Sequence, residues 1–245
     1  MSVSSQAYWN DIEIEKTKPY WVEDPSDTKL LRFLREETNL ERCLRDALGF
    51  AAGLRPLSGR VLDVGAGVAW SSAMLSVIEG VREVVATDLS SHRLLRVAPI
   101  VFKQMGGVGE KFVSVVDDFR RKAWGPASFD MVLFVQSLYM FPDLKETLGH
   151  AHRLLVSGGL VVVACERIVP DHSPFSFGYY RTRLRRLFRG RADVSGNHGY
   201  VDREYREAIQ AAGFDYRFQV LDYPVYPATH SLRAGNHFGI KAGPA

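Results

Sequence analysis

The chain is poor in cysteine and contains no long apolar run. Only Cys43 and Cys165 occur among 245 residues, so no disulfide framework is indicated and both are expected as buried thiols. The longest apolar runs, 131–135 and 160–165, are far shorter than the roughly 20 residues that a membrane-spanning helix needs. The first 18 residues lack the apolar segment of a signal peptide. These absences favour a cytoplasmic protein without a membrane span.

The composition shows no sign of low complexity and little excess of charge. With 46% apolar and 24% charged residues, the length suits a single α/β domain over 1–245. The formal charge of +3 comes from residues 181–191, which hold six arginines and no acid, and the balance elsewhere is 25 − 28 = −3. Because only this one stretch is basic, no nucleic-acid partner is expected. Nothing in the sequence indicates an oligomeric state.

Short apolar segments and helical periodicities alternate along the middle of the chain. Strands rich in valine are predicted at 60–64, 81–87, 112–116, 129–135 and 160–165. Helices are predicted between them at 70–78, 91–104 and 144–155. This alternation predicts a parallel sheet with right-handed crossovers.

The flanking regions complete the predicted domain. An N-terminal arm and helices occupy 1–54, where Thr38 and Glu41 are predicted to form a capping box. The core at 55–165 is followed by an insertion at 166–200. A helix and two strands at 201–245 then end the chain.

The turn after the first strand carries the most informative motif, Asp63-Val64-Gly65-Ala66-Gly67. Glycines at this position let backbone amides approach a ligand closely. A dinucleotide fingerprint would need a small residue where Trp70 stands, which disfavours an NAD-linked oxidoreductase. The Asp63 carboxylate suits a cationic or hydroxyl-bearing ligand better than a pyrophosphate. Asp63 could instead only cap the turn, and Asp88 could form an Asx-turn at the end of its strand.

These motifs resemble those of class I S-adenosylmethionine-dependent methyltransferases. The D-x-G-x-G turn is similar to the first motif of that family, and Asp88 follows Asp63 by 25 residues at the end of the second strand. Asp117-Asp118-Phe119 looks like the adenine-binding motif, and residues 152–160 are similar to the turn into the fifth strand. The resemblance covers about 55–165 and is nearest to the quinone-biosynthesis branch, methyltransferase type 11.

The resemblance implies a fold, a cofactor and the residues that bind it. The fold would be a seven-stranded, Rossmann-like, mostly parallel sheet flanked by helices, with the last strand antiparallel. The cofactor would be S-adenosylmethionine, with no metal, and Asp88 would hold the ribose hydroxyls. The implied cofactor-binding residues are Asp63, Gly65, Ala66, Gly67, Asp88, Leu89, Asp118, Phe119 and Gln136.

The same resemblance implies methyl transfer to oxygen or nitrogen of a small-molecule acceptor, within a biosynthetic pathway. Three candidates for catalytic or acceptor-binding roles follow the fourth and fifth strands or lie in the insertion. Tyr139 would border the methyl group, Glu166 would point into the crevice and bind the acceptor, and His198 would act as general base. The alternatives are a core aromatic for Tyr139, an ion pair with Arg167 for Glu166, and an exposed loop residue for His198.

The acceptor is expected to meet the arm 1–27 and the basic insertion. Arginines at 181–191 favour an anionic or polar acceptor, although a solvated helix or contact with a membrane surface or RNA would use the same residues. Besides an NAD-linked oxidoreductase, the remaining alternative is a non-catalytic protein that binds adenosylmethionine or serves as a partner subunit.

Overall fold

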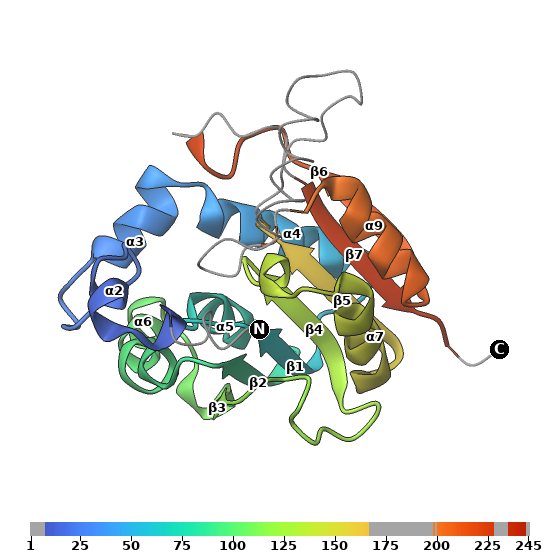
Figure 1. Ribbon diagram of the computed structural model, residues 1–245, viewed down its shortest axis with the longest axis horizontal. Helices are drawn as coiled ribbons and strands as arrows, with labels where there is room; N and C mark the ends of the chain where they lie inside the picture. The colour runs from blue at the N-terminus through green and yellow to red at the C-terminus, as the bar shows by residue number, and fades with distance from the viewer. Residues whose placement is uncertain (1–7, 167–197, 199, 228–234, 244–245) are drawn as a thin grey trace.

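The computed structural model describes residues 8–166, 198, 200–227 and 235–243, and its central element is one seven-stranded sheet (Figure 1). The strand order is β3-β2-β1-β4-β5-β7-β6. The strands are β1 (Gly59–Val64), β2 (Val81–Asp88), β3 (Phe112–Val116), β4 (Phe129–Val135), β5 (Leu155–Ala164), β6 (Phe214–Val220) and β7 (Gly235–Lys241). The last strand, β7, runs antiparallel between β5 and β6, which confirms the expected Rossmann-like sheet.

Helices cover both faces of the sheet because its central strands are apolar on both sides. On one face, Val61, Leu133 and Val162 pack against α4 (Leu40–Leu54), α5 (Trp70–Ser76) and α6 (Ala98–Gln104). On the other face, the adjacent strand residues Leu62, Val132 and Val161 pack against α7 (Leu144–Leu154) and α9 (Asp202–Ala211). The two expected buried thiols, Cys43 and Cys165, lie in the first of these layers.

The shorter helical elements belong mainly to the arm and to the connections. They are α2 (Ile12–Lys16), α3 (Lys29–Arg32), η1 (Phe33–Glu37), η2 (Arg93–Val97), η3 (Gly109–Lys111) and η4 (Leu138–Met140). The helix expected at 91–104 is divided into the π-type turn η2 and α6, and Pro99 in the first turn of α6 lacks the N–H that a continuous helix would use.

Two local predictions were wrong. The capping box of Thr38 and Glu41 does not form, because Asn39 is the N-cap of α4 and the Glu41 carboxylate pairs with Arg35 and Arg45. The fifth strand begins at Leu155 instead of 160, because the chain pairs with β4 on both sides of an irregularity between these positions.

The register of the sheet brings the carboxyl ends of β1, β2 and β4 together. Val64 pairs with Thr87 on one side and with Phe134 on the other. From β1 the chain proceeds to β2 and β3 in one direction and later to β4 and β5 in the other. Such a reversal point is where open α/β sheets bind their ligands.

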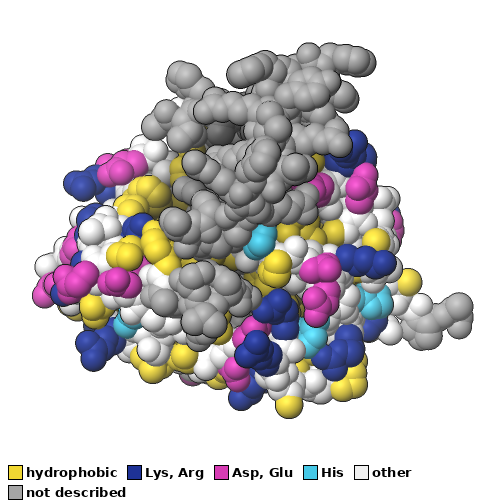
Figure 2. Space-filling model, viewed as in Figure 1, with side chains coloured by type: hydrophobic (Ala, Val, Ile, Leu, Met, Phe, Trp, Pro, Cys, Tyr) yellow, Lys and Arg dark blue, Asp and Glu magenta, His cyan; other side chains and the backbone are white. Residues whose placement is uncertain are grey.

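The described surface carries charges of both signs. Figure 2 shows Lys, Arg, Asp and Glu side chains scattered around the rim of one face, without a patch of a single sign among the described residues in view. In the described parts of the chain, every helix is too short or too polar to cross a membrane.

Candidate active site

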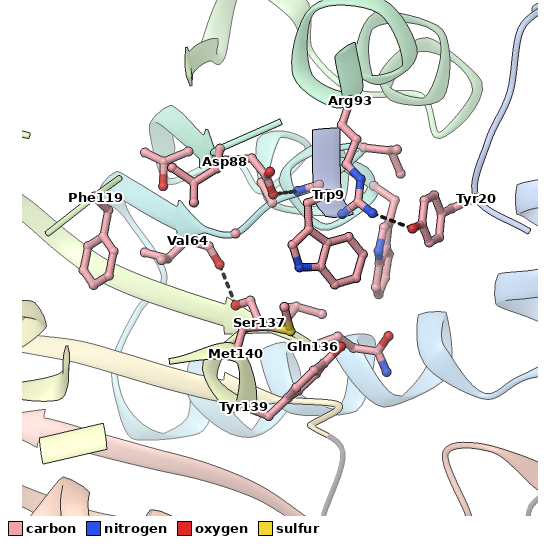
Figure 3. A pocket seen from close by; sticks show the side chains of 18 of the residues that line it. Trp9, Tyr20, Val64, Asp88, Arg93, Phe119, Gln136, Ser137, Tyr139 and Met140 are labelled. Atoms are coloured by element: carbon pink, nitrogen blue, oxygen red, sulfur yellow. Dashed lines mark hydrogen bonds between the residues drawn. The ribbon is translucent and has the colours of Figure 1, made fainter. Parts of the chain in front are cut away.

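A pocket of about 180 Å³ lies at the carboxyl ends of β1, β2 and β4 (Figure 3). The turn after each of these strands contributes to its wall, together with the loop after β3 and the N-terminal arm. Of the nine residues expected to bind cofactor, the pocket wall includes Gly65, Ala66, Gly67, Asp88, Leu89, Asp118, Phe119 and Gln136.

The glycine turn is shaped by close contacts that exclude larger side chains. Gly65 has a φ of +67°, and a Cβ atom there would lie 2.7 Å from the Cβ of Ser137. The Ser137 hydroxyl donates a hydrogen bond of 2.6 Å to the carbonyl of Val64, which holds the turns after β1 and β4 together. Glycine at position 65 is therefore required both by the backbone conformation and by the adjacent turn.

Asp88 is placed at the end of β2 so that its carboxylate faces the glycine turn. One oxygen accepts the amide of Gly67 at 2.9 Å, and the other accepts the amide of Ser90 at 2.8 Å. The contact with Ser90 is an Asx-turn, the alternative role considered for Asp88. Asp88 therefore forms this turn and also lines the pocket. Each carboxylate oxygen retains a further lone pair for a ligand hydroxyl.

Asp63 lies beneath the pocket and is not part of its described wall. The side chain is fully buried, and Oδ2 accepts hydrogen bonds from the hydroxyls of Ser71 and Ser72 at 2.7 and 2.6 Å. Burial raises the pKa of Asp63 to about 6, although the two serine hydroxyls act against this rise. Its Oδ1 has no hydrogen-bond partner among the described residues. Asp63 thus connects the glycine turn to the first turn of α5.

The loop after β3 brings Asp118 and Phe119 into the pocket wall. Asp118 forms a bidentate ion pair with Arg120, with distances of 2.8 and 3.1 Å. Burial alone would raise the pKa of Asp118, but the hydrogen bonds and charge of Arg120 hold it below its usual value. Phe119 packs edge-on against Phe134 and Phe141, which fixes its ring in the wall.

Glu166 is anchored below the turn after β4. Its Oε1 accepts the amides of Ser137 and Leu138 at 2.9 and 3.0 Å, and Oε2 accepts the amide of Tyr139 at 2.9 Å and the hydroxyl of Tyr205 at 3.3 Å. The expectation that Glu166 points into the crevice was wrong, because these four donors hold its carboxylate and the residue as a whole is only 4% exposed. The turn that it holds includes the pocket residues Ser137 and Tyr139.

The other two candidate catalytic residues occupy different positions. Tyr139 lines the pocket, as expected. The backbone N–H of His198 donates a hydrogen bond of 3.0 Å to the Tyr139 carbonyl, and its partly buried ring stacks on Tyr200 at a centroid distance of 5.9 Å. His198 is not one of the described residues that line the pocket.

The N-terminal arm closes one side of the pocket through an ion pair that the sequence did not predict. Arg93, just after β2, forms two hydrogen bonds of 2.5 and 2.6 Å with the fully buried carboxylate of Glu15. Its guanidinium lies 4.4 Å from the ring centroid of Trp9 and 4.8 Å from that of Tyr20. In the view of Figure 3, the Trp9 ring lies across the middle of the pocket. The partners are 78 residues apart, so no local sequence signal indicates their contact.

The charges of the pocket suit a positively charged ligand such as S-adenosylmethionine, which carries a sulfonium, an ammonium and a carboxylate. The charged residues of the described wall are Asp88, Asp117, Asp118 and Arg93, and the last two are already paired with Arg120 and Glu15. Asp88 and Asp117 leave an excess of negative charge, and the glycine turn leaves room for a ligand at the backbone. No cluster of three His, Cys, Asp or Glu residues suited to a metal occurs in the described part of the chain.

Comparison with known proteins indicates one family. A sequence model described as a methyltransferase domain matches residues 35–218. A segment of the highly reducing polyketide synthase gloL from Glarea lozoyensis is 30% identical over 173 residues, which cover 67% of this chain and 7% of the synthase. The chain therefore spans only a small part of that relative's length.

Solved structures share the same fold at low sequence identity. The phosphoethanolamine N-methyltransferase 2 of Haemonchus contortus, in complex with S-adenosyl-L-methionine, is 16% identical with a TM-score of 0.64. That alignment covers 99% of this chain and 61% of the nematode protein. The YcgJ protein of Bacillus subtilis is 17% identical with a TM-score of 0.59, covering 82% of this chain and all of the bacterial protein.

Proposed function

Because this chain belongs to the methyltransferase domain family and is an S-adenosylmethionine-dependent methyltransferase, we propose that it methylates oxygen or nitrogen of a small-molecule acceptor in a biosynthetic pathway. The observation that carries the cofactor assignment is the position of Asp88, whose carboxylate faces the glycine turn at the edge of the pocket. A biosynthetic role is supported by the similarity to a segment of a polyketide synthase. The motifs and the family leave no support for the NAD-linked alternative.

We assign the cofactor to the part of the pocket between the glycine turn and Phe119. Asp88 would accept hydrogen bonds from the ribose hydroxyls, and Asp118 and Phe119 would border the adenine. Gln136 would lie near the methionine part, because it follows β4 and lines the same pocket. The glycine turn would provide the close backbone approach.

For this reaction the protein mainly has to align the acceptor with the methyl group and exclude water. S-adenosylmethionine supplies a methyl group already activated on its sulfonium. Holding an acceptor in line with that methyl group can lower the barrier by roughly 7–11 kcal/mol in favourable cases. Tyr139 is our candidate for the side chain that orients the acceptor, because it lines the pocket next to Gln136. A general base is required only where the acceptor atom keeps its proton at neutral pH, and His198 remains the candidate for that role.

The cofactor assignment is tested by calorimetric titration with S-adenosylmethionine, S-adenosylhomocysteine and NAD. The protein is expected to bind the first two and not NAD. Asp88→Ala should weaken binding of S-adenosylhomocysteine about tenfold or more, because hydrogen bonds to a charged group contribute roughly 1.5–3 kcal/mol. Asp215→Ala, on the exposed part of β6, is the matched control and should bind as the wild type does. Unchanged affinity in a folded Asp88→Ala protein would remove Asp88 from the cofactor site.

A further inference from the structure

The arm side of the pocket is built from apolar and aromatic side chains. Trp9 and Tyr20 come from the arm, and Phe33 comes from η1. Across the pocket, Tyr139 follows β4. We call these four residues the aromatic wall. They lie in three separate segments of the chain and meet only in the folded protein.

The polar end of Tyr20 is turned to the Glu15–Arg93 pair. Its hydroxyl donates to the Glu15 carboxylate at 3.1 Å and accepts from Arg93 at 2.5 Å. Burial raises the pKa of this hydroxyl, so Tyr20 stays neutral. The pocket therefore meets its ring, and the Glu15–Arg93 pair fixes the position of that ring.

The described pocket offers no cation to an anionic acceptor. Arg93 is the one described basic residue in the wall, and Glu15 neutralises it through two hydrogen bonds. Asp88 and Asp117 give the wall two negative charges, and a bound S-adenosylmethionine of net charge +1 offsets one of them. A carboxylate or phosphate entering this space would be repelled by the two aspartates and would lose its hydration without a cationic partner among the described residues of the wall.

From these two features we infer that the acceptor is an uncharged molecule with a flat, apolar body that packs against the aromatic wall. This inference rests on the proposed function and names the substrate class of the same site. Flat apolar rings gain from burial and from edge or stacked contacts with aromatic side chains. It differs from the expectation of an anionic or polar acceptor, which depends on residues 181–191, outside the described part of the chain.

The test uses two probes that share a ring system and differ by one charge. 2-Naphthol is neutral, and 6-hydroxy-2-naphthoate carries a carboxylate on the same bicyclic body. Each is titrated calorimetrically into protein saturated with S-adenosylhomocysteine. Naphthol is expected to bind, and the naphthoate at least tenfold more weakly. Replacing Asp117 by Asn removes one negative charge and should raise the affinity for naphthoate about threefold while naphthol affinity stays unchanged.

The aromatic wall is tested by Phe33→Ala, which should weaken naphthol binding about tenfold without changing the affinity for S-adenosylhomocysteine. Phe50→Ala is the matched control, since Phe50 is a partly buried aromatic residue of α4 that packs on Phe238 outside the pocket. If the alanine variant does not fold, Phe33→Leu replaces it. This variant keeps an apolar side chain but lacks the ring, so it should also bind naphthol more weakly than the wild type does.

The outcomes separate this inference from the proposed function. If the wild type fails to bind S-adenosylhomocysteine, the proposed function itself is wrong. If the wild type binds S-adenosylhomocysteine but not naphthol, only the inference of a neutral, apolar acceptor is overturned. The same holds if it binds naphthoate as tightly as naphthol or more tightly. The same inference is overturned if folded Phe33→Ala binds naphthol as tightly as the wild type does. Where Phe33→Ala does not fold, equal naphthol binding by Phe33→Leu and the wild type overturns it.

Discussion

Glu166 provides the sharpest test of how the turn after β4 is held. The substitution Glu166→Gln keeps the size of the side chain but replaces one carboxylate oxygen by an NH₂ group. Three backbone amides, those of Ser137, Leu138 and Tyr139, converge on the carboxylate in the wild type. A glutamine oxygen cannot accept from all three in this geometry, and its NH₂ group would face the amide of Tyr139 as a second donor.

Two opposing effects set the expected change in stability. Burial raises the pKa of Glu166 from 4.5 to about 7, although the three amides and Tyr205 lower it. A rise of this size means that keeping the ionised group in the folded protein costs about 3 kcal/mol at pH above 7. Leaving one buried amide unsatisfied costs roughly 1–3 kcal/mol. At pH 8.5 these terms nearly cancel, whereas below about pH 4.5, where Glu166 is protonated in both the folded and the unfolded chain, only the cost of the lost contact remains.

The sign of the pH dependence follows from the raised pKa. Because the folded protein holds the proton of Glu166 more tightly than the unfolded chain, its contribution to stability is complete below about pH 4.5. That contribution is lost as the pH rises through about 7. The wild type should therefore lose up to about 3 kcal/mol more than Glu166→Gln between pH 4.5 and 8.5.

The assay is urea denaturation of the wild type and Glu166→Gln across this pH range. Glu146→Gln, an exposed glutamate in the first turn of α7, is the matched control and should keep the wild-type pH dependence. Calorimetry with S-adenosylhomocysteine should also show weaker binding by Glu166→Gln, because the turn that lines the pocket has lost its anchor. Parallel stability curves for the wild type and Glu166→Gln would refute this account of the buried carboxylate.

Substitutions elsewhere test single contacts. Ala69, the N-cap of α5, has a left-handed φ of 59°, so Ala69→Gly should raise the free energy of unfolding in urea by about 0.5–1 kcal/mol; lower stability contradicts this. Glu15→Gln should loosen the arm from Arg93 and speed its cleavage by trypsin, whereas the exposed Glu79→Gln should be cleaved at the wild-type rate. With an acceptor in hand, His198→Ala should lower turnover and remove the acidic limb of the pH–rate profile; retention of both leaves catalysis to alignment alone.

The strands of the core were predictable because their signal is local. Each carries a short valine-rich run, and the turns between them contain glycine or a capping aspartate. The boundary errors arose where the backbone departs from regular geometry. In β5, Gly158 adopts a φ of +71° within the irregular stretch, so the strand begins earlier than its apolar run indicates.

The side of the pocket around the glycine turn, which we assign to the cofactor, was also largely predictable as a place in the fold, for the same reason. Gly65, Gly67 and Asp88 are placed by the ends of two adjacent strands, and the sheet register brings them together. Asp63 and Glu166 were placed less well, since a sequence gives the position of a carboxylate but not its direction. In the structure, both carboxylates turn inward to nearby hydroxyl or amide donors.

The arm side of the pocket, where we propose that the acceptor binds, could not be predicted because distant segments build it. Trp9 and Tyr20 reach the pocket through the contact of Glu15 with Arg93, which depends on the tertiary fold and leaves no periodic pattern in the sequence. This division matches the demands of the chemistry. In the proposed arrangement, the strand ends keep one geometry around the cofactor, whereas alignment of the acceptor requires only a wall of the right shape and charge. We therefore expect a change in the arm to alter which acceptor binds while the residues assigned to the cofactor stay in place.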